Sequence, residues 1–287
     1  ENCVYINGVE VYRPLLISSG QQEGLSVINS DMVEKVEFSA GGFEAKYGDR
    51  MSSVLDITYA RPQKAEASVQ ASLLGANIYA GLGNRKISLS QGLRYKTNQY
   101  MLGSLETKGE YSPSFLDYQA YLSWTPSEKW TFDLIGYISK NDYNFKPKDR
   151  ETNFGTLEDV KSFKVYFDGK EEDLFRTLYG TFKITRKWER KHALSLSASA
   201  FNTKERETYD IQGQYWLNET TSDKQLGVGT YMEHARNLLS SQTQTFKLTY
   251  DFRQGNHHLQ TGLSWRHESI SESSREWEYR DSSGYSV

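Results

Sequence analysis

Four things are scarce or missing in this chain: cysteine, long apolar runs, a net positive charge and catalytic motifs. Its single cysteine, Cys3, cannot form an internal disulfide, which excludes a disulfide framework. Only 37% of the residues are hydrophobic and the mean hydropathy is −0.70, so no transmembrane helix of about 20 apolar residues is available. The net charge of −3 leaves no basic footprint for nucleic acid.

Signals of catalysis and of metal binding are also missing. The sequence contains no HExxH, CxxC, GxSxG or P-loop motif. His257 and His258 are adjacent, and adjacent residues on a strand point to opposite faces, so they make a poor metal pair. The acidic run at 171–173 favours a solvated surface over calcium binding. We therefore expect no enzyme, no bound metal and no cofactor.

What the sequence does contain begins with a small module over residues 1–60, which we expect to be a mixed α/β piece. Asn7-Gly8 lies between two β-forming runs and predicts a hairpin with a type I′ turn. Asn29 and the residues after it are suited to cap a short helical turn. Gly41, Gly42 and Gly48 mark positions where the backbone needs a positive φ or a close approach.

The residues of this module also resemble a known family. The segments NGVEVYRP, INSDMVEKVEF, GGFEAKYGDR and SSVLDI are similar to the C-terminal half of the plug in TonB-dependent outer-membrane receptors. The matching positions are Glu37, Gly41, Gly42, Tyr47, Gly48, Arg50, Ser52, Ser53 and Ile57. One departure is that Ser52-Ser53 and Asp56 stand where many members have Gly-Gly and Asn.

Residues 61–287 alternate apolar and polar side chains with period two, which predicts antiparallel strands. We expect about nine strands, joined alternately by tight turns and by long loops at roughly 97–115, 143–175 and 206–240. Short turns on one side and long loops on the other are typical of an outer-membrane barrel. Trp124, Trp130 and Trp188 fall beside the short turns, which suits an interfacial girdle, although cross-strand packing in a soluble sandwich would explain them equally well.

The resemblance implies a transmembrane β-barrel of about 22 strands, of which this chain would hold the first part. It also implies active, TonB-driven import of a nutrient such as a siderophore, cofactor, glycan or peptide through the bacterial outer membrane. The N-terminal half of the plug and the segment that contacts TonB would precede this chain. A surface lipoprotein lid is a further partner that the family allows. Glu37 and Arg50 are our predicted ion-pairing residues between plug and barrel.

The ligand would be bound on the extracellular side. Exposed aromatic residues among hydrogen-bonding neighbours suit a polar ligand that also stacks. The predicted ligand-loop residues are Tyr209, Tyr215, Trp216, Tyr231 and His234. Loop-against-loop packing is the alternative for each of them. Two other classes stay open at this point: a non-transporting barrel that serves as an adhesin or secretion scaffold, and a soluble β-rich binding domain or glycosidase.

Overall fold

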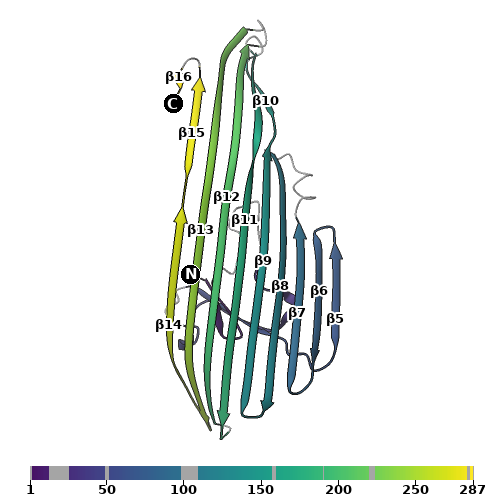
Figure 1. Cartoon of the computed structure of the whole chain (residues 1–287), viewed down its shortest axis with the longest axis vertical. Helices are drawn as coiled ribbons and strands as arrows, with labels where there is room; N and C mark the ends of the chain where they lie inside the picture. Colours follow the sequence, from purple (N-terminus) through teal and green to yellow (C-terminus); the bar gives the residue numbers. More distant parts are fainter. Residues whose placement is uncertain are drawn as a thin grey trace.

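The computed structural model describes residues 2–12, 26–48, 52–97, 109–156, 160–189, 191–219, 224–282 and 285–286. These residues form two sheets, a small N-terminal one and a large one that makes up the rest of the molecule (Figure 1). In this part of the chain, no helix is long and apolar enough to cross a membrane.

The small sheet has the strand order β2-β1-β4-β3. Its elements are β1 Asn2–Ile6, β2 Val9–Val11, η1 Ser30–Met32, β3 Val33–Ser39, η2 Ala45–Tyr47 and β4 Ser53–Tyr59. The predicted hairpin is confirmed, because Asn7 (φ 51°) and Gly8 (φ 78°) join the antiparallel strands β1 and β2. The helical content differs from the expected α/β piece: the described residues hold only two 3₁₀ turns, η1 and η2.

The large sheet has twelve strands, and the pairs between neighbouring strands are antiparallel. Its strands are β5 Glu66–Ser72, β6 Gly75–Gly83, β7 Ile87–Thr97, β8 Gly109–Ser127, β9 Trp130–Pro147, β10 Arg150–Gly155, β11 Val160–Trp188, β12 His192–Glu219, β13 Lys224–Gln254, β14 His257–Ser273, β15 Glu276–Ser282 and β16 Tyr285–Ser286. The predicted mainly β, antiparallel architecture is confirmed. The nine strands expected from the alternation are β5–β9 and β11–β14, and the sheet adds the shorter β10, β15 and β16.

The prediction of long connections at 143–175 and 206–240 is wrong, because most of these residues form strands. The strands β11, β12 and β13 run through most of these ranges, and β11 pairs with β12 without a break from Lys161↔Glu219 to Trp188↔His192. The sequence did not reveal this because charged and polar residues interrupt the apolar ones on both faces, so hydrophobic alternation is weak although the backbone ladder continues. The short turns appear where expected, at the lower end of Figure 1.

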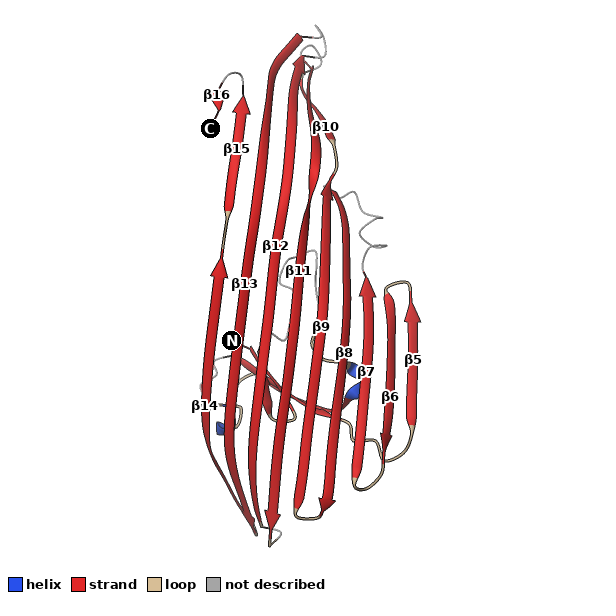
Figure 2. Ribbon diagram, viewed as in Figure 1, coloured by secondary structure: helices blue, strands red, loops and turns tan. Residues whose placement is uncertain are grey.

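The two faces of the large sheet differ in what they contact. The inward face carries buried aromatic residues that pack against the small sheet. Figure 2 shows the small sheet crossing the lower half of the large sheet. The shared core includes Ile6, Val11, Met32, Ile57, Tyr59, Tyr121, Tyr137, Tyr179 and Phe201. Because side chains alternate along a strand, the residues between these point to the opposite, outward face.

The outward face carries a band of exposed apolar side chains. Members from five strands are Leu134, Ile138, Leu178, Phe182, Leu196, Phe246, Leu248 and Leu263. On β11 the band extends from Leu178 down to Trp188, a span of about ten residues, which is what a tilted strand needs to cross a bilayer. Trp124 and Trp130 stack with Phe132 at the end of the band next to the short turns, and Trp124 and Phe132 are cross-strand partners, so both cross-strand packing and a place in an aromatic girdle fit them.

Candidate functional site: the interface between the two sheets

A buried ion pair on the large sheet forms the centre of the interface. Arg94 on β7 and Asp117 on β8 are direct cross-strand partners, and their side chains are 7% and 0% exposed. The guanidinium donates in a fork to the carboxylate, with Nε–Oδ1 at 2.9 Å and Nη2–Oδ2 at 2.5 Å. Two-pronged contacts of this kind fix direction as well as charge, so the free N–H groups of Arg94 are aimed at a defined place.

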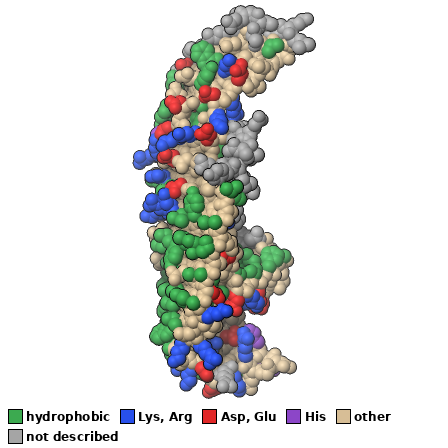
Figure 3. All heavy atoms as spheres, turned by 90° about the vertical axis from the view of Figure 1, so that its right-hand side faces the viewer, with side chains coloured by type: hydrophobic (Ala, Val, Ile, Leu, Met, Phe, Trp, Pro, Cys, Tyr) green, Lys and Arg blue, Asp and Glu red, His purple; other side chains and the backbone are tan. Residues whose placement is uncertain are grey.

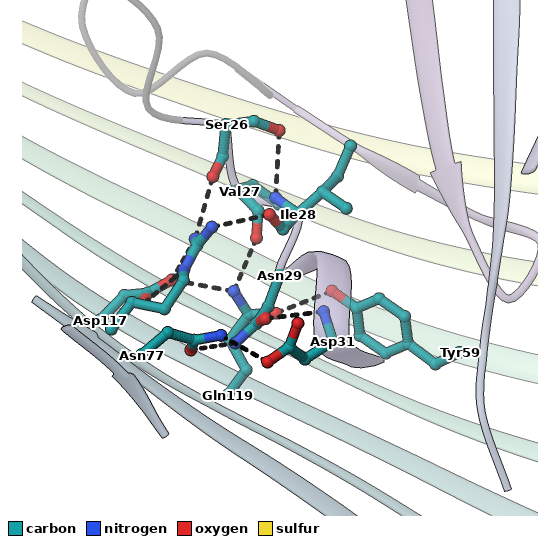
Figure 4. A network of polar contacts seen from close by, with 10 residues as sticks. Ser26, Val27, Ile28, Asn29, Asp31, Tyr59, Asn77, Asp117 and Gln119 are labelled. Atoms are coloured by element: carbon teal, nitrogen blue, oxygen red, sulfur yellow. Dashed lines mark hydrogen bonds and ion pairs between the residues drawn. The ribbon is translucent and has the colours of Figure 1, made fainter. Parts of the chain in front are cut away.

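That place is the backbone just before η1. Arg94 donates from Nη1 to the carbonyl of Ile28 (2.7 Å) and from Nη2 to that of Ser26 (3.0 Å). The Gln119 amide donates to the intervening carbonyl of Val27 at 2.7 Å. Figure 4 shows the segment Ser26, Val27 and Ile28 beside Asp117 and Gln119 of β8, with these hydrogen bonds as dashed lines. The segment takes part in these contacts through its backbone carbonyls, and Arg94 and Gln119 of the large sheet supply the donors.

A second set of contacts holds η1 itself. Asn29 caps the turn, as predicted, by accepting a hydrogen bond from the Asp31 amide at 3.1 Å. Asp31 then accepts hydrogen bonds from Ser68 on β5 and from Asn77 on β6, both at 2.8 Å. One acidic residue of the small sheet is therefore bound by two neighbouring strands at one side of the large sheet.

The chain that leaves the small sheet is held by a third set. Arg61 lies between β4 and β5, and it donates to the Tyr121 hydroxyl (2.7 Å) and to Asp133 (3.0 Å). The Tyr121 hydroxyl donates in turn to Asp133 at 2.9 Å. Since Tyr59 also donates to Gln119 at 2.7 Å, the exit strand and its continuation are joined to β8 and β9.

The small sheet also reaches the other side of the large sheet. The hydroxyls of Tyr12 and Thr245 on β13 lie 3.1 Å apart, and Arg266 on β14 lies over the Tyr12 ring. Lys183 on β11 donates to the Asn7 carbonyl at 3.4 Å. The small sheet is thus held across the width of the large one, from β5 to β14.

Of the two predicted ion-pairing residues, the structure describes Glu37 alone, and its ion pair is local. Glu37 pairs with Lys35 on its own strand at 2.7 Å, and both side chains are more than half exposed. Arg50 lies outside the described residues. The residues that do bridge the sheets include Arg94 and Gln119, which occupy polar positions of alternating strands. The alternation shows that such residues face inward but cannot show which of them meet.

The predicted turn residues behave as the sequence indicated. Gly41 (φ 92°), Gly42 (φ 61°) and Gly48 (φ 68°) all have left-handed backbone conformations. The Tyr47 ring packs on Tyr5 with centroids 5.0 Å apart, and its hydroxyl donates to Asp56 at 2.7 Å. Burial and this hydrogen bond raise the pKa of Tyr47 to about 12. The hydrogen bond gives Asp56, the departure from the family pattern, a defined structural partner.

The five predicted ligand-loop residues lie on β12 and β13 rather than in loops, and the structure divides them between two faces. Inward positions are odd-numbered on both strands, as Phe201 and Thr245 show by contacting Tyr12. Tyr209, Tyr215 and Tyr231 therefore lie on the inward wall above the small sheet, where they do not share a face with the other two.

Trp216 and His234 are the two that lie on the outward face. The His234 ring stacks on Trp277 with centroids 5.2 Å apart, and its Nδ1 lies 2.5 Å from Asp210. Asp210 also pairs with Arg236. His234 is thus bound within an outer-face cluster and is not placed to share a ligand with Tyr231.

The inward wall also carries an acidic cluster. Glu171, Asp173 and Glu207 each place a carboxylate oxygen within 4.8 Å of the others. Among the described residues, this is the group of carboxylates whose spacing would suit a cation. Asp173 is 8% exposed. Burial, together with the charges of Glu171 and Glu207, raises the pKa of Asp173 to about 7. The sequence suggested a solvated run at 171–173, because it does not show that Glu207 lies directly opposite Asp173 on the neighbouring strand.

Comparisons with known proteins add a likeness in shape. No protein-family model matches the sequence, and no curated protein does. The structure is similar to the copper transporter OprC (9% identity, 98% of this chain, 52% of that chain, TM-score 0.39). It is also similar to the siderophore receptor PirA from Acinetobacter baumannii (8%, 98%, 69%, 0.35) and to the ferric enterobactin receptor PfeA from Pseudomonas aeruginosa (9%, 94%, 63%, 0.34).

The chain spans about half the length of OprC. At these TM-scores the likeness carries no argument about function, so the proposals that follow rest on the residues and contacts of this chain.

Proposed function

We propose that this chain is part of a TonB-dependent receptor that imports a nutrient across the bacterial outer membrane. Residues 1–60 would be the C-terminal part of the plug, and residues 61–287 would be the first part of the barrel. The observation that carries this proposal is the pairing of two properties in one sheet. Its outward face is an exposed apolar band, and its inward face holds a small domain by an apolar core, the Arg61–Asp133 ion pair and hydrogen bonds.

The nature of these contacts supports a plug that is released rather than a permanent core. Arg94 and Gln119 bind the segment 26–28 only through its carbonyls, and Ser68 and Asn77 bind Asp31 at the edge of the small sheet. Beside the apolar core that the two sheets share, these polar contacts can exchange for water when the segment moves. A pull transmitted from TonB through the plug would have to break the hydrogen bonds from Arg94 to the carbonyls of Ser26 and Ile28.

For the ligand we propose the inward wall above the plug. Tyr209, Tyr215 and Tyr231 lie there, on the face that also holds the acidic cluster of Glu171, Asp173 and Glu207. Aromatic rings beside carboxylates favour a polar ligand with a stacking surface and hydrogen-bond donors or positive charge. Trp216 and His234, on the outward face, would not contact it. A surface lipoprotein lid remains a proposed partner of the family.

The first step of the test identifies the ligand. The protein is extracted from its own outer membrane in mild detergent and weighed by native mass spectrometry, which reports a bound small molecule or a lipoprotein partner. Accumulation of that molecule by cells is then measured with and without a protonophore.

We expect the protonophore to abolish accumulation while binding at the cell surface persists. Accumulation that does not depend on the proton-motive force would overturn the proposal and indicate a passive barrel. A protein that carries no ligand and supports no accumulation would indicate an adhesin or a secretion scaffold.

A further inference from the structure

Four basic side chains lie together on the outward face of the large sheet, and we call them the basic row. Lys140 on β9, Arg176 on β11 and Lys204 on β12 are direct cross-strand partners. Arg206 is the next outward residue on β12. All four are exposed. Since residues two apart on a strand share a face, Arg176 stands on the same face as Leu178 below it.

The basic row is short of negative charge. Lys140 pairs with Asp142 at 2.7 Å. Across the described residues, no ion pair or hydrogen bond is made by the side chains of Arg176, Lys204 or Arg206. Like charges directly opposite each other on neighbouring strands repel and are destabilising. An anion bound against the row would reduce this repulsion. Three unpaired cations within two rows leave room for more than one negative group.

The height of the row on the sheet indicates which anion this is. The row directly below it contains Ile138 and Leu178, which are 55% and 59% exposed and belong to the apolar band. Figure 3 shows Lys and Arg side chains gathered immediately above the hydrophobic band, on the side away from the small sheet. A group at this height meets lipid head groups of the leaflet on the side of the long strands.

We propose that the basic row binds the phosphates of an outer-leaflet lipid whose head group carries more than one phosphate. This rests on the proposed outer-membrane location. Arg176 and Arg206 can each present the planar fork that matches a phosphate, and Lys204 between the strands adds a point charge. Directly opposed side chains on neighbouring strands stand about 5 Å apart, so one head group can reach two of these cations at once.

The test uses the protein purified in mild detergent and placed in nanodiscs of phosphatidylcholine. Lipid A with two phosphates, lipid A without phosphates and inorganic phosphate are added separately, and bound copies are counted by native mass spectrometry. The variant is Arg176→Gln, Lys204→Gln, Arg206→Gln. A control of equal charge change, Lys129→Gln, Lys187→Gln, Lys191→Gln, alters the opposite end of the strands.

We expect the unaltered protein and the control to retain the doubly phosphorylated lipid, and the variant to bind it roughly 100-fold more weakly, at about a factor of five for each cation lost. Equal binding of the dephosphorylated lipid, or equal retention by the variant, would overturn the proposal. If inorganic phosphate saturates the row and the lipid binds no more tightly, the bound phosphate would not come from a lipid, and that result would also overturn the proposal. All three proteins should insert into membranes alike, and failure of insertion would count against the proposed function instead.

Discussion

Removing the charge of Asp117 tests whether the Arg94–Asp117 pair holds the small sheet in place. In Asp117→Asn the amide keeps nearly the same shape, but Arg94, whose side chain is 7% exposed, is left as a buried charge without its partner. Breaking a buried pair from one side costs about 3–5 kcal/mol. Since each 1.4 kcal/mol is a factor of ten, a cost of about 3–5 kcal/mol should make opening of the segment 26–32 roughly 10²- to 4 × 10³-fold more frequent.

Hydrogen exchange measured by mass spectrometry reports this opening directly. The amides of Ile28, Asp31 and Met32 are all hydrogen-bonded in the segment, so they should be protected in the unaltered protein. The matched control is Glu37→Gln, which removes a carboxylate from an exposed pair and should leave exchange in this segment unchanged.

A double variant separates charge from shape. Arg94→Met with Asp117→Leu removes both charges, so no buried ion is left alone, and we expect a smaller rise in exchange than in Asp117→Asn. Some rise should remain, because the carbonyls of Ser26 and Ile28 lose their donors. Equal exchange rates in Asp117→Asn and Glu37→Gln would refute the reasoning.

Three further predictions follow from the same structure. Tyr47→Phe loses the hydrogen bond to Asp56 and should destabilise the small sheet by about 1 kcal/mol, seen as a lower unfolding midpoint in urea. The pKa of Asp173 is raised to about 7 from its ordinary 3.8, so ionisation of this carboxyl lowers the stability of the fold. With a chelator present, amide protection around 171–173 should therefore fall as pH rises from 5 to 8. Asp173→Asn should remove that pH dependence. Tyr231→Ala should weaken ligand binding at least tenfold, whereas Trp216→Ala should leave the dissociation constant unchanged.

Much of the fold could be predicted from local residue patterns. Asn7-Gly8 and the three glycines with positive φ specify turns through their own backbone preferences, and Asn29 specifies a cap through its side chain. Period-two alternation located the strands wherever one face meets a different environment from the other. These features were found because each depends on residues that are close together in the sequence.

Features that depend on distant pairing could not be predicted. In the extension of β11 and β12 beyond the apolar band, charged residues such as those at 170–173 interrupt the apolar ones, so the hydrophobic alternation is too weak to mark it as strand. The partners Arg94 and Asp117 are separated by a long connection, and nothing in either neighbourhood identifies the other. The separation of Tyr231 from His234 onto opposite faces follows from parity, but only once both are known to lie on one strand.

The measurement that tests the central claim most directly is a removable tether between the two sheets. The Ser68 hydroxyl lies 2.8 Å from the Asp31 carboxylate, so a cysteine pair is placed at these two positions in a Cys3→Ser background, and mass spectrometry establishes whether the disulfide forms. Uptake of the identified ligand is measured in cells after oxidation and again after reduction. A releasable plug predicts that oxidation abolishes uptake and that reduction restores it. Undiminished uptake by protein shown by mass spectrometry to carry the disulfide would contradict the account.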